Sequence, residues 1–422
     1  MSLIGSFCKA AFLIVAVLCL DSRSTFAKPL DEFYIQEFLR LSDSSQMWQS
    51  SAFLNQLKDE IHQLKYDGLF PEHYQIDAGS ERVTIVRQYF SALSDLHYGL
   101  TFATDIEPYL TYPTERAERH QDASRIMNFA LAAMENPLDA FALARPDNEQ
   151  YQRLRHAYQL ALWCEELDAD KQLSIQINLE RLRYISRMMS ENMVLVDIVG
   201  AELTVFDQGE SILNQTSQVG RTDRQTPLMW SEITHITVNP SWTVPPTVYR
   251  DDMLPQIRQS ISFLEENQIQ VLDFDGHVLN PNSINWRNPG RILLRQKPGD
   301  LNELGRIVVR FPNNEAIFLH DTPSQGYFSE QMRALSSGCI RLQEAPLLAE
   351  TLLRLSQTEQ VDQLKELLTN GRTQEIFLDN KIPVLLAYWT VDADDQGKID
   401  FRTDLYALDE PLKQFIKDLA GR

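Results

Sequence analysis

Cysteine is scarce in this chain, which has four in 422 residues. Cys8 and Cys19 lie in an N-terminal segment that we expect to be removed, so two cysteines remain. Two cysteines do not make a disulfide framework, and a small disulfide-stapled fold is therefore excluded. We interpret Cys164, in the apolar helical pattern ALWCEEL, as a core residue, because free cysteine is often buried. Cys339 is then the cysteine that remains for chemistry.

Long hydrophobic runs are missing as well. The apolar run from Ala10 to Leu20 has 11 residues, whereas an ordinary spanning helix needs about 20. Lys9 precedes this run and Thr25-Phe26-Ala27 follows it, a pattern typical of a signal peptide over residues 1–27. We expect this segment to direct export and then to be cleaved; a retained N-terminal anchor is the alternative. No later stretch is apolar enough to span a bilayer, so no membrane span is expected after cleavage.

Positive charge is in short supply. The chain has 39 Lys and Arg against 59 Asp and Glu, and its formal net charge is −20. So acidic a chain repels polyanions, which argues against nucleic acid as a partner. It also requires local basic groups wherever an anionic substrate binds. Arg295, Lys297 and Arg341 are the candidates for that role, while most acidic side chains are expected to solvate helix faces.

The patterns that are present predict an α+β fold. A hydrophobic content of 43% and this length allow two or three domains with sizeable cores. Between residues 28 and 190 apolar residues recur at helical spacings, as in Phe53, Leu57 and Ile61. From residue 191 the pattern changes to short β-branched runs such as MVLVDIV and ELTVFDQ. We therefore expect an all-helical N-terminal domain followed by a β-rich domain.

The candidate catalytic residues lie in the stretch AIFLHDTPSQGYFSEQMRALSSGCIRL, residues 316–342. We expect residues 316–319 to form a buried strand that places His320 at its exposed end, followed by a turn-rich loop. A short helix is expected over residues 328–335. The bend Ser336-Ser337-Gly338 then presents Cys339, which lies 19 positions after His320.

These residue types suit nucleophilic catalysis by a thiol. A thiol with a pKa of roughly 8.5 is only partly ionised at neutral pH, and the thiolate is the attacking species. His320 would take the thiol proton, and Arg341 would favour the thiolate or hold a substrate carboxylate. Backbone N–H groups of the bend would stabilise an oxyanion. From spacing alone, a buried cysteine near an unrelated histidine remains the alternative.

The whole string resembles the catalytic motif of the YkuD-type L,D-transpeptidases, in which a histidine and a loop precede Ser-x-Gly-Cys-x-Arg. It is most similar to the large multidomain branch of that family, since LHDTP and SGCIR occur together. The resemblance implies that Cys339 is the acyl-accepting nucleophile and His320 its base. Two residues depart from the pattern: Ser337 stands where many relatives have a second histidine, and Phe318 where a tyrosine often stands.

The same resemblance implies roles for the other residues of the site. Ser337 and Gly338 would form the oxyanion turn. The residues expected to bind substrate are Arg341, Ser336, Asp321 and Thr322. Trp242 and Trp286 would line the groove, with core packing as the alternative for Trp242.

Likeness to the family extends over nearly the whole mature chain. DGLFPEHYQI resembles its helical scaffold domain, and NPSWTVPPTV, RQKPGDLNELG and RFPNN resemble parts of its catalytic domain. The expected domains are 28–190 (scaffold), 191–375 (catalytic, with a cap at about 245–298) and 376–422 (C-terminal hairpin and helix). A peptidoglycan-binding insertion commonly interrupts the scaffold in this branch, and it is not found in this sequence.

The resemblance implies a periplasmic enzyme that acts on peptidoglycan. It would join a tetrapeptide donor to a diamino-acid acceptor in a 3→3 cross-link through a Cys339 thioester, release D-alanine, and be inhibited by carbapenems. The alternatives are an L,D-carboxypeptidase, a hydrolase of cross-links or anchored proteins, and a catalytically silent wall-binding protein. No cofactor or metal is expected. Asp392 and Asp394 mimic the start of a calcium loop, but its twelfth position is Thr403 instead of Glu.

Overall fold

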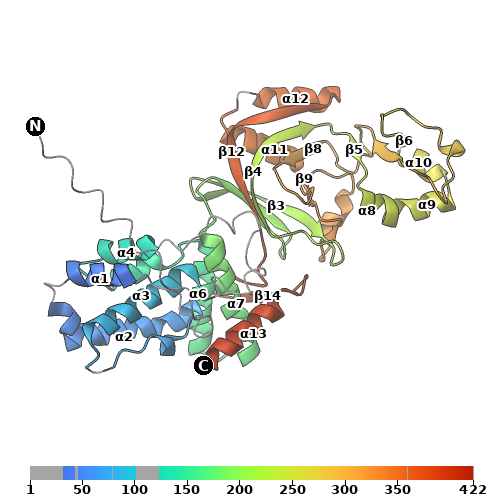
Figure 1. Cartoon of the computed structure of the whole chain (residues 1–422). Coiled ribbons are helices and arrows are strands. Elements are labelled where there is room, and N and C mark those ends of the chain that lie inside the picture. Colours follow the sequence, from blue (N-terminus) through green and yellow to red (C-terminus); the bar gives the residue numbers. More distant parts are fainter. Residues whose placement is uncertain (1–31, 43–45, 78, 101–122, 359, 422) are drawn as a thin grey trace, which may run out of the picture.

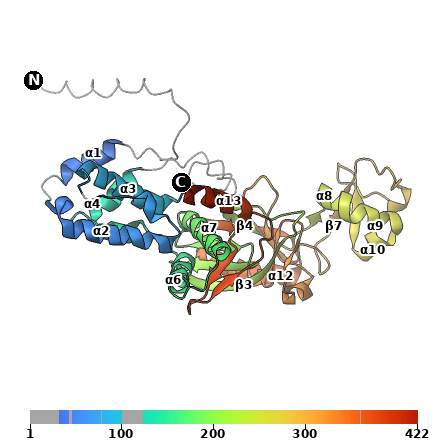
Figure 2. The same ribbon diagram turned by 90° about the horizontal axis from the view of Figure 1, so that it is seen from below.

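The computed structural model describes residues 32–421 except 43–45, 78, 101–122 and 359. The expected signal peptide, residues 1–27, lies outside the described residues. Three parts follow one another in space: a helical domain, a sheet domain and a small outlying subdomain (Figures 1 and 2). The predicted α+β class, with helices before a β-rich domain, is confirmed. None of the described helices has the length and apolarity that crossing a bilayer requires.

The first part of the helical domain packs around aromatic side chains. Trp48, Tyr89 and Phe90 are fully buried, and the rings of Trp48 and Tyr89 meet edge to face at 5.4 Å. Gly68, with φ +73°, ends the turn after the second helix, as left-handed glycines commonly do. The elements are α1 (Glu32–Leu41), η1 (Gln46–Gln49), α2 (Ser51–Gln63), η2 (Leu64–Asp67), η3 (Pro71–His73), α3 (Arg82–Tyr98), α4 (Ala123–Ala132) and α5 (Asp139–Ala144).

Two longer helices, α6 (Glu149–Trp163) and α7 (Ala169–Ser186), join the helical domain to the sheet domain. Each begins at a side-chain cap, because Asn148 and Asp168 accept backbone N–H groups of the first turn. The helix α7 is apolar on several sides, since it packs on α6, on strands of the sheet and on α13 (Asp409–Ala420). The two domains are therefore joined by a shared core.

The sheet of the second domain closes on itself. Its nine strands follow the order β10-β3-β11-β9-β8-β4-β12-β1-β2, and β2 also pairs with β3. The strands are β1 (Met193–Asp197), β2 (Glu202–Asp207), β3 (Glu210–Gly220), β4 (Met229–Val238), β8 (Ile307–Arg310), β9 (Leu319–His320), β10 (Ala334–Ser336), β11 (Ile340–Leu342) and β12 (Gln374–Ala387). The strands around the site, β9 and β11, thus lie inside this sheet and not at its edge.

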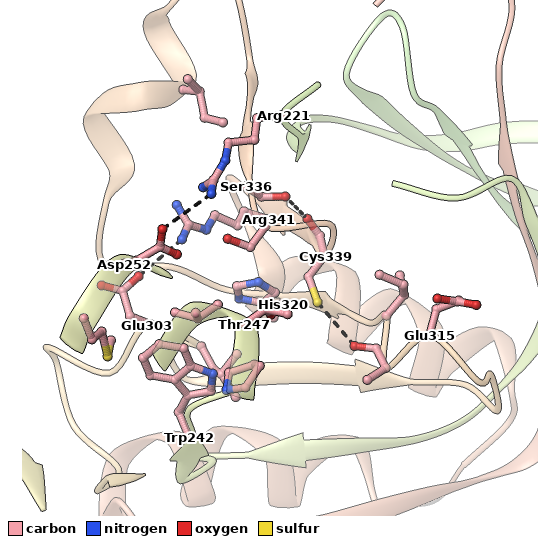
Figure 3. Close-up of a pocket in the computed structure, with 18 residues that line it drawn as sticks. Arg221, Trp242, Thr247, Asp252, Glu303, Glu315, His320, Ser336, Cys339 and Arg341 are labelled. Atoms are coloured by element: carbon pink, nitrogen blue, oxygen red, sulfur yellow. Dashed lines mark hydrogen bonds and ion pairs between the residues drawn. The ribbon is translucent and has the colours of Figure 1, made fainter. Parts of the chain in front are cut away.

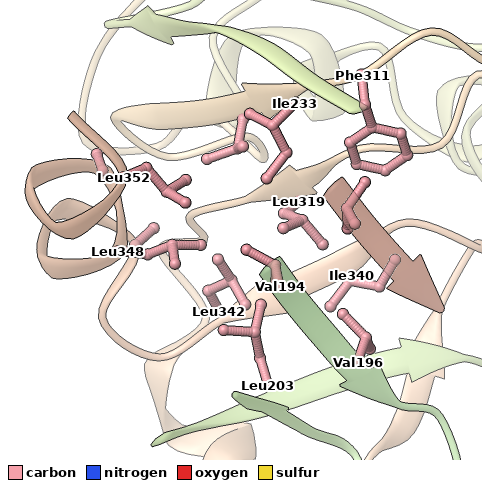
Figure 4. Packing of buried hydrophobic residues seen from close by; sticks show 14 of the residues in the cluster. Val194, Val196, Leu203, Ile233, Phe311, Leu319, Ile340, Leu342, Leu348 and Leu352 are labelled. Atoms are coloured by element: carbon pink, nitrogen blue, oxygen red, sulfur yellow. The ribbon is translucent and has the colours of Figure 1, made fainter. Parts of the chain in front are cut away.

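Apolar side chains on one face of these strands form the main core. Leu319, Ile340 and Leu342 are fully buried there and pack towards α11 (Ala345–Leu355), which contributes Leu348 and Leu352 (Figure 4). The helix α12 (Val361–Asn370) covers the same cluster. Because alternate residues of a strand point to opposite faces, the neighbours of these core residues point towards the other face, where the site lies.

The segment between residues 242 and 296 forms the outlying subdomain, which we call the cap (Figure 1). It has its own small sheet, in the order β5-β7-β6, and its own core, with Ile257, Leu264 and Val271 buried. Its elements are β5 (Trp242–Thr243), α8 (Pro246–Val248), η6 (Tyr249–Met253), α9 (Leu254–Gln259), α10 (Ser262–Glu266), β6 (Ile269–Leu272), η7 (Pro281–Ser283) and β7 (Leu293–Gln296).

Two expectations for the catalytic stretch are wrong. The predicted helix over 328–335 is absent: a 3₁₀ turn, η8 (Gln325–Ser329), is followed by β10, because Ala334 and Ser336 pair with β3. The predicted strand over 316–319 shrinks to β9, which starts at Leu319, since Ala316 takes a left-handed φ of +55°. For residues 334–336, pairing with a distant strand thus overrides the local pattern.

Two further expectations need correction. Cys164 is exposed and not part of the core, because α6 ends at Trp163 and the cysteine is its C-terminal cap. The boundary expected between residues 375 and 376 falls inside β12, whose strand pairs with both β1 and β4. The C-terminal hairpin is therefore shorter than expected and consists of β13 (Val391–Ala393) and β14 (Ile399–Phe401).

A buried carboxylate holds the parts of the helical domain together. Asp67 is fully buried, and its Oδ1 atom accepts hydrogen bonds from Arg145, Arg155 and the Tyr151 hydroxyl at 2.8–2.9 Å. Its backbone oxygen accepts from Arg183 of α7 at 2.5 Å. One aspartate thus ties the turn after α2 to α6 and to the segment after α5.

We predict that Asp67→Ala destabilises the helical domain by about 3–5 kcal/mol, because it leaves arginines buried without their carboxylate. A loss of that size lowers the unfolding temperature by roughly 10 °C, which calorimetry would measure. Asp59→Ala, which removes an exposed carboxylate from α2, is the control and should change the unfolding temperature little. Equal unfolding temperatures for the two variants would contradict the role of Asp67.

Candidate active site

Strand pairing brings the two ends of the catalytic stretch together. β9 and β11 are parallel neighbours, with Leu319 opposite Ile340 and His320 opposite Arg341. Since Leu319 and Ile340 face the core, strand alternation turns His320, Arg341 and the preceding Cys339 to the opposite face. The thiol, the imidazole and the guanidinium meet there at one cavity (Figure 3).

A locked bend presents the cysteine. The Ser336 hydroxyl donates to the Cys339 carbonyl at 2.5 Å and accepts the Gly338 N–H at 3.1 Å. Thr226 donates to the Gly338 carbonyl at 2.8 Å. Gly338 has φ +112°, a conformation that side chains rarely adopt, so the glycine predicted at this bend is required. Ser336, expected to bind substrate, lines the cavity, and its hydroxyl also makes these two hydrogen bonds inside the bend.

The thiol of Cys339 is half-buried and protonated at rest. Its Sγ atom donates to the Ala316 carbonyl over 3.6 Å. Burial raises the pKa of Cys339 to about 11, although the Phe318 N–H and the charges of Arg341 and Arg310 oppose this rise. At neutral pH the group is therefore a thiol and not a thiolate.

The imidazole of His320 is buried and neutral. Burial, with the nearby charge of Arg341, lowers the pKa of His320 to about 3. Its Nδ1 atom lies 2.5 Å from the Asp321 carbonyl, which assigns the ring proton to Nδ1 and leaves Nε2 as an acceptor. The ring of Phe318 packs against His320 edge to face at 5.8 Å. Among the described residues no hydrogen bond joins this ring to the thiol, so the thiol must turn away from Ala316 to transfer its proton.

Arg341 lies in the cavity with a carboxylate partner. Its Nη2 atom is 3.3 Å from Oε2 of Glu303, and its buried Nε atom has no hydrogen-bond partner among the described residues. The cavity has a volume of about 340 Å³, the lower end of the range for small-molecule sites. Other residues that line it are Arg221, Trp242, Asp252, Met253, Glu303, Leu304, Glu315 and Leu335.

Ion pairs that the sequence did not indicate tie the cap to the catalytic bend. Arg224, between β3 and β4, pairs with Asp252 of the cap at 2.6 Å and with Asp251 at 3.3 Å. Its guanidinium also donates to the Ser337 hydroxyl at 3.1 Å. Arg221 reaches Asp252 at 3.5 Å. Ser337, expected at the oxyanion turn, lines the cavity and also takes part in this link. No local pattern in the sequence predicts contacts between such distant segments.

Other expected site residues lie elsewhere. Asp321 and Thr322 do not line the cavity: Asp321 accepts the Arg306 and Thr322 N–H groups at 2.8 Å, and Thr322 is buried. Burial raises the pKa of Asp321, and its carbonyl orients His320. Trp242 lines the cavity as predicted. Arg295, Lys297 and Trp286 do not; Arg295 bonds Thr243, and the Trp286 Nε1 atom donates to Pro281.

Among the residues that the structure describes, one group has the composition of a metal site. Asp273, Asp275 and His277, on an exposed loop of the cap, bring ligand atoms within 4.8 Å of one another. Asp273 accepts the N–H groups of Asp275 and His277, which is the ordinary pattern of an Asx turn. In the segment that mimics a calcium loop, Asp392 pairs with Arg402 at 3.0 Å and Asp394 caps the hairpin turn. These carboxylates are thus explained by local structure.

Comparison with known families agrees with this geometry. Residues 191–373 match the L,D-transpeptidase catalytic domain (YkuD), and residues 34–157 match the Scaffold domain. The chain therefore carries a YkuD-type L,D-transpeptidase catalytic domain after a Scaffold domain, and the resemblance in its motif is confirmed.

Each individual relative matches only part of the chain. The Haemophilus influenzae protein named "Putative L,D-transpeptidase" is 32% identical over 243 residues, which are 56% of this chain and 48% of that protein. The match thus spans about half the length of this curated relative. An L,D-transpeptidase from Mycobacterium smegmatis is 13% identical, over 46% of this chain and 58% of its own, with a TM-score of 0.23. A solved L,D-transpeptidase in complex with imipenem is 13% identical, over 47% and 59%, with a TM-score of 0.22.

We predict that Cys339 reacts with iodoacetamide at a rate that rises about tenfold per pH unit from pH 7 to 10, because the alkylated species is the thiolate and the pKa is about 11. The experiment uses a Cys164→Ser background, since Cys164 is exposed. A thiolate paired with a protonated His320 would instead give a rate that is constant across neutral pH. Such a plateau would contradict the neutral state of both groups.

We also predict that Asp252→Asn loosens the cap. Hydrogen exchange of η6 and of the catalytic bend should become about two- to fivefold faster, because partly exposed ion pairs contribute up to about 1 kcal/mol. Asp275→Asn, an exposed cap carboxylate outside the cavity, is the matched control. Exchange rates that change equally in the two variants would show that Arg224 does not hold the cap through Asp252.

Proposed function

We propose that this protein is a periplasmic L,D-transpeptidase that forms 3→3 cross-links between peptidoglycan stem peptides. The observation that carries the proposal is the convergence of Cys339, a neutral His320 and Arg341 on one face of one cavity, within a YkuD-type domain. A thiol, an unprotonated base and a carboxylate-binding cation are the groups that acyl transfer from a peptide donor requires.

Acylation of the enzyme is the first half of the proposed reaction. The Sγ atom of Cys339 attacks the carbonyl carbon of the third residue of a tetrapeptide donor, and His320 accepts the thiol proton at Nε2. The C–N bond to the terminal D-alanine breaks, and the same proton passes to the leaving amine. Arg341 binds a donor carboxylate in place of Glu303, and the Cys339 backbone N–H is the donor that we expect to meet the oxyanion.

Resolution of the thioester decides the product. The side-chain amine of a diamino acid on a neighbouring stem gives the cross-link. Water in its place would give an L,D-carboxypeptidase, and attack on existing bonds would give a hydrolase of cross-links or anchored proteins. A catalytically silent wall-binding protein is the alternative least consistent with the site, because all three reactive groups are present.

We further propose that carbapenem-type β-lactams acylate Cys339. One relative is described in complex with imipenem and another as an avibactam carbamoyl enzyme, which concerns those proteins. The cavity beside this thiol would take such a reagent by the same attack on a carbonyl carbon. Export to the periplasm would depend on residues 1–27.

The test is incubation of the purified protein with tetrapeptide muropeptides, followed by separation of dimers from tripeptides. We predict that Cys339→Ser abolishes both products and the carbapenem adduct seen by intact mass, because a serine hydroxyl is far harder to ionise beside a neutral histidine. Cys164→Ser should retain full activity and adduct, since that thiol lies outside the cavity. Turnover by Cys339→Ser, or no turnover by the wild type, would overturn the proposal.

A further inference from the structure

We propose that Glu315 recognises the positively charged amine of the acceptor and so directs the thioester towards cross-linking and away from hydrolysis. The inference rests on the proposed function, and it assigns to this chain a residue that determines the choice of acceptor. It follows from how charge is distributed around the thiol.

The charged groups of the cavity fall on two sides of Cys339 (Figure 3). On one side Arg341 pairs with Glu303 and Arg221 with Asp252, so that cations and anions balance. On the other side stands Glu315, which is exposed and has no Lys, Arg or His within ion-pair distance among the described residues. Among the residues that line the cavity, Glu315 is therefore the charged group on that side, and its carboxylate has no ion-pair partner.

The backbone holds Glu315 close to the nucleophile. The Asn313 side chain accepts the N–H groups of Glu315 and Ile317 at 3.1 and 2.9 Å and donates to the Ile317 carbonyl at 2.7 Å. The next residue, Ala316, adopts a left-handed φ of +55° and offers its carbonyl to the thiol. The carboxylate thus belongs to the residue directly before the one that the thiol contacts, on a loop fixed by several hydrogen bonds.

This placement suits an amine acceptor. If the carboxylate of the donor binds at Arg341, the acceptor has to approach the thioester from the side of Glu315. A primary amine with a pKa of roughly 10.4 is an ammonium ion at neutral pH, and a carboxylate attracts it over several ångströms. Water carries no charge and lacks this charge–charge attraction to Glu315, so the carboxylate favours the amine over water.

The step balances as follows. The ammonium ion releases one proton to solvent at the open side of the cavity, and its nitrogen then attacks the thioester carbon. The new C–N bond forms, the C–S bond breaks, and the surplus proton on nitrogen passes through His320 to the departing Sγ atom. Glu315 binds and orients the acceptor; it does not take part in these bond changes.

The experiment measures the ratio of cross-linked dimer to tripeptide formed from a tetrapeptide muropeptide that serves as donor and acceptor. Glu315→Gln should lower this ratio about two- to fivefold, the effect of an exposed ion pair, and Glu315→Lys should lower it further. Acylation by a carbapenem should not slow in either variant. The difference between wild type and variants should shrink in about 1 M salt, where the Debye length is about 3 Å.

Two controls separate this effect from a general loss of charge. Glu366→Gln removes an exposed carboxylate from α12, outside the cavity, and should keep the wild-type ratio. A muropeptide whose side-chain amine is acetylated can act only as donor, so the wild type and Glu315→Gln should hydrolyse it at equal rates.

The inference is overturned if wild type and Glu315→Gln give equal ratios at low salt while both are acylated. It is also overturned if the wild type is acylated but yields tripeptide alone. A wild type that is never acylated would overturn the proposed function itself, and the inference with it.

Discussion

The site depends on the parallel contact between β9 and β11. Its register sets Leu319 against Ile340 in the core and His320 against Arg341 at the cavity. A slip of one residue in either strand would turn its apolar side chain towards the cavity and its catalytic side chain into the core. Because both apolar side chains are fully buried, such a slip would lose the transfer free energy of one large side chain, about 1.5–3 kcal/mol. The main core therefore fixes the geometry of the reactive groups.

Burial shifts the pKa values of the nucleophile and its base in opposite directions, and both shifts favour the uncharged form. It raises the pKa of the Cys339 thiol and lowers that of the His320 imidazole, so both groups are uncharged across the physiological range. A resting ion pair between a Cys339 thiolate and a protonated His320 is thereby disfavoured. The thiol proton moves to His320 only as the sulfur attacks a carbonyl carbon. A neutral thiol is also less reactive towards oxidants than a thiolate.

The sequence pattern predicted those features that depend on residues close together in the chain. Helical spacing predicted the helical domain, and the Ser-Ser-Gly pattern predicted a bend before Cys339, where Gly338 has a positive φ. The failures lie where distant segments meet. Residues 334–336 became a strand because β3 offered a partner, and the Arg224 to Asp252 pair joins segments whose contact no sequence period encodes. Asp321 follows His320 in the motif and was therefore expected to bind substrate, yet its carboxylate accepts the backbone N–H of Arg306.

In the proposed reaction, the carboxylate already paired with Arg341 affects how an anionic donor binds. Arg341 already has the carboxylate of Glu303, so a donor carboxylate exchanges with one of equal charge and the net electrostatic gain is small. Affinity must then come from the rest of the donor, while the fork of Arg341 selects the geometry. The exchange also keeps the charge near His320 constant. Since Arg341 helps to hold the pKa of His320 low, and an anion faces that guanidinium both before and after the donor binds, the histidine is still a neutral base when acylation begins.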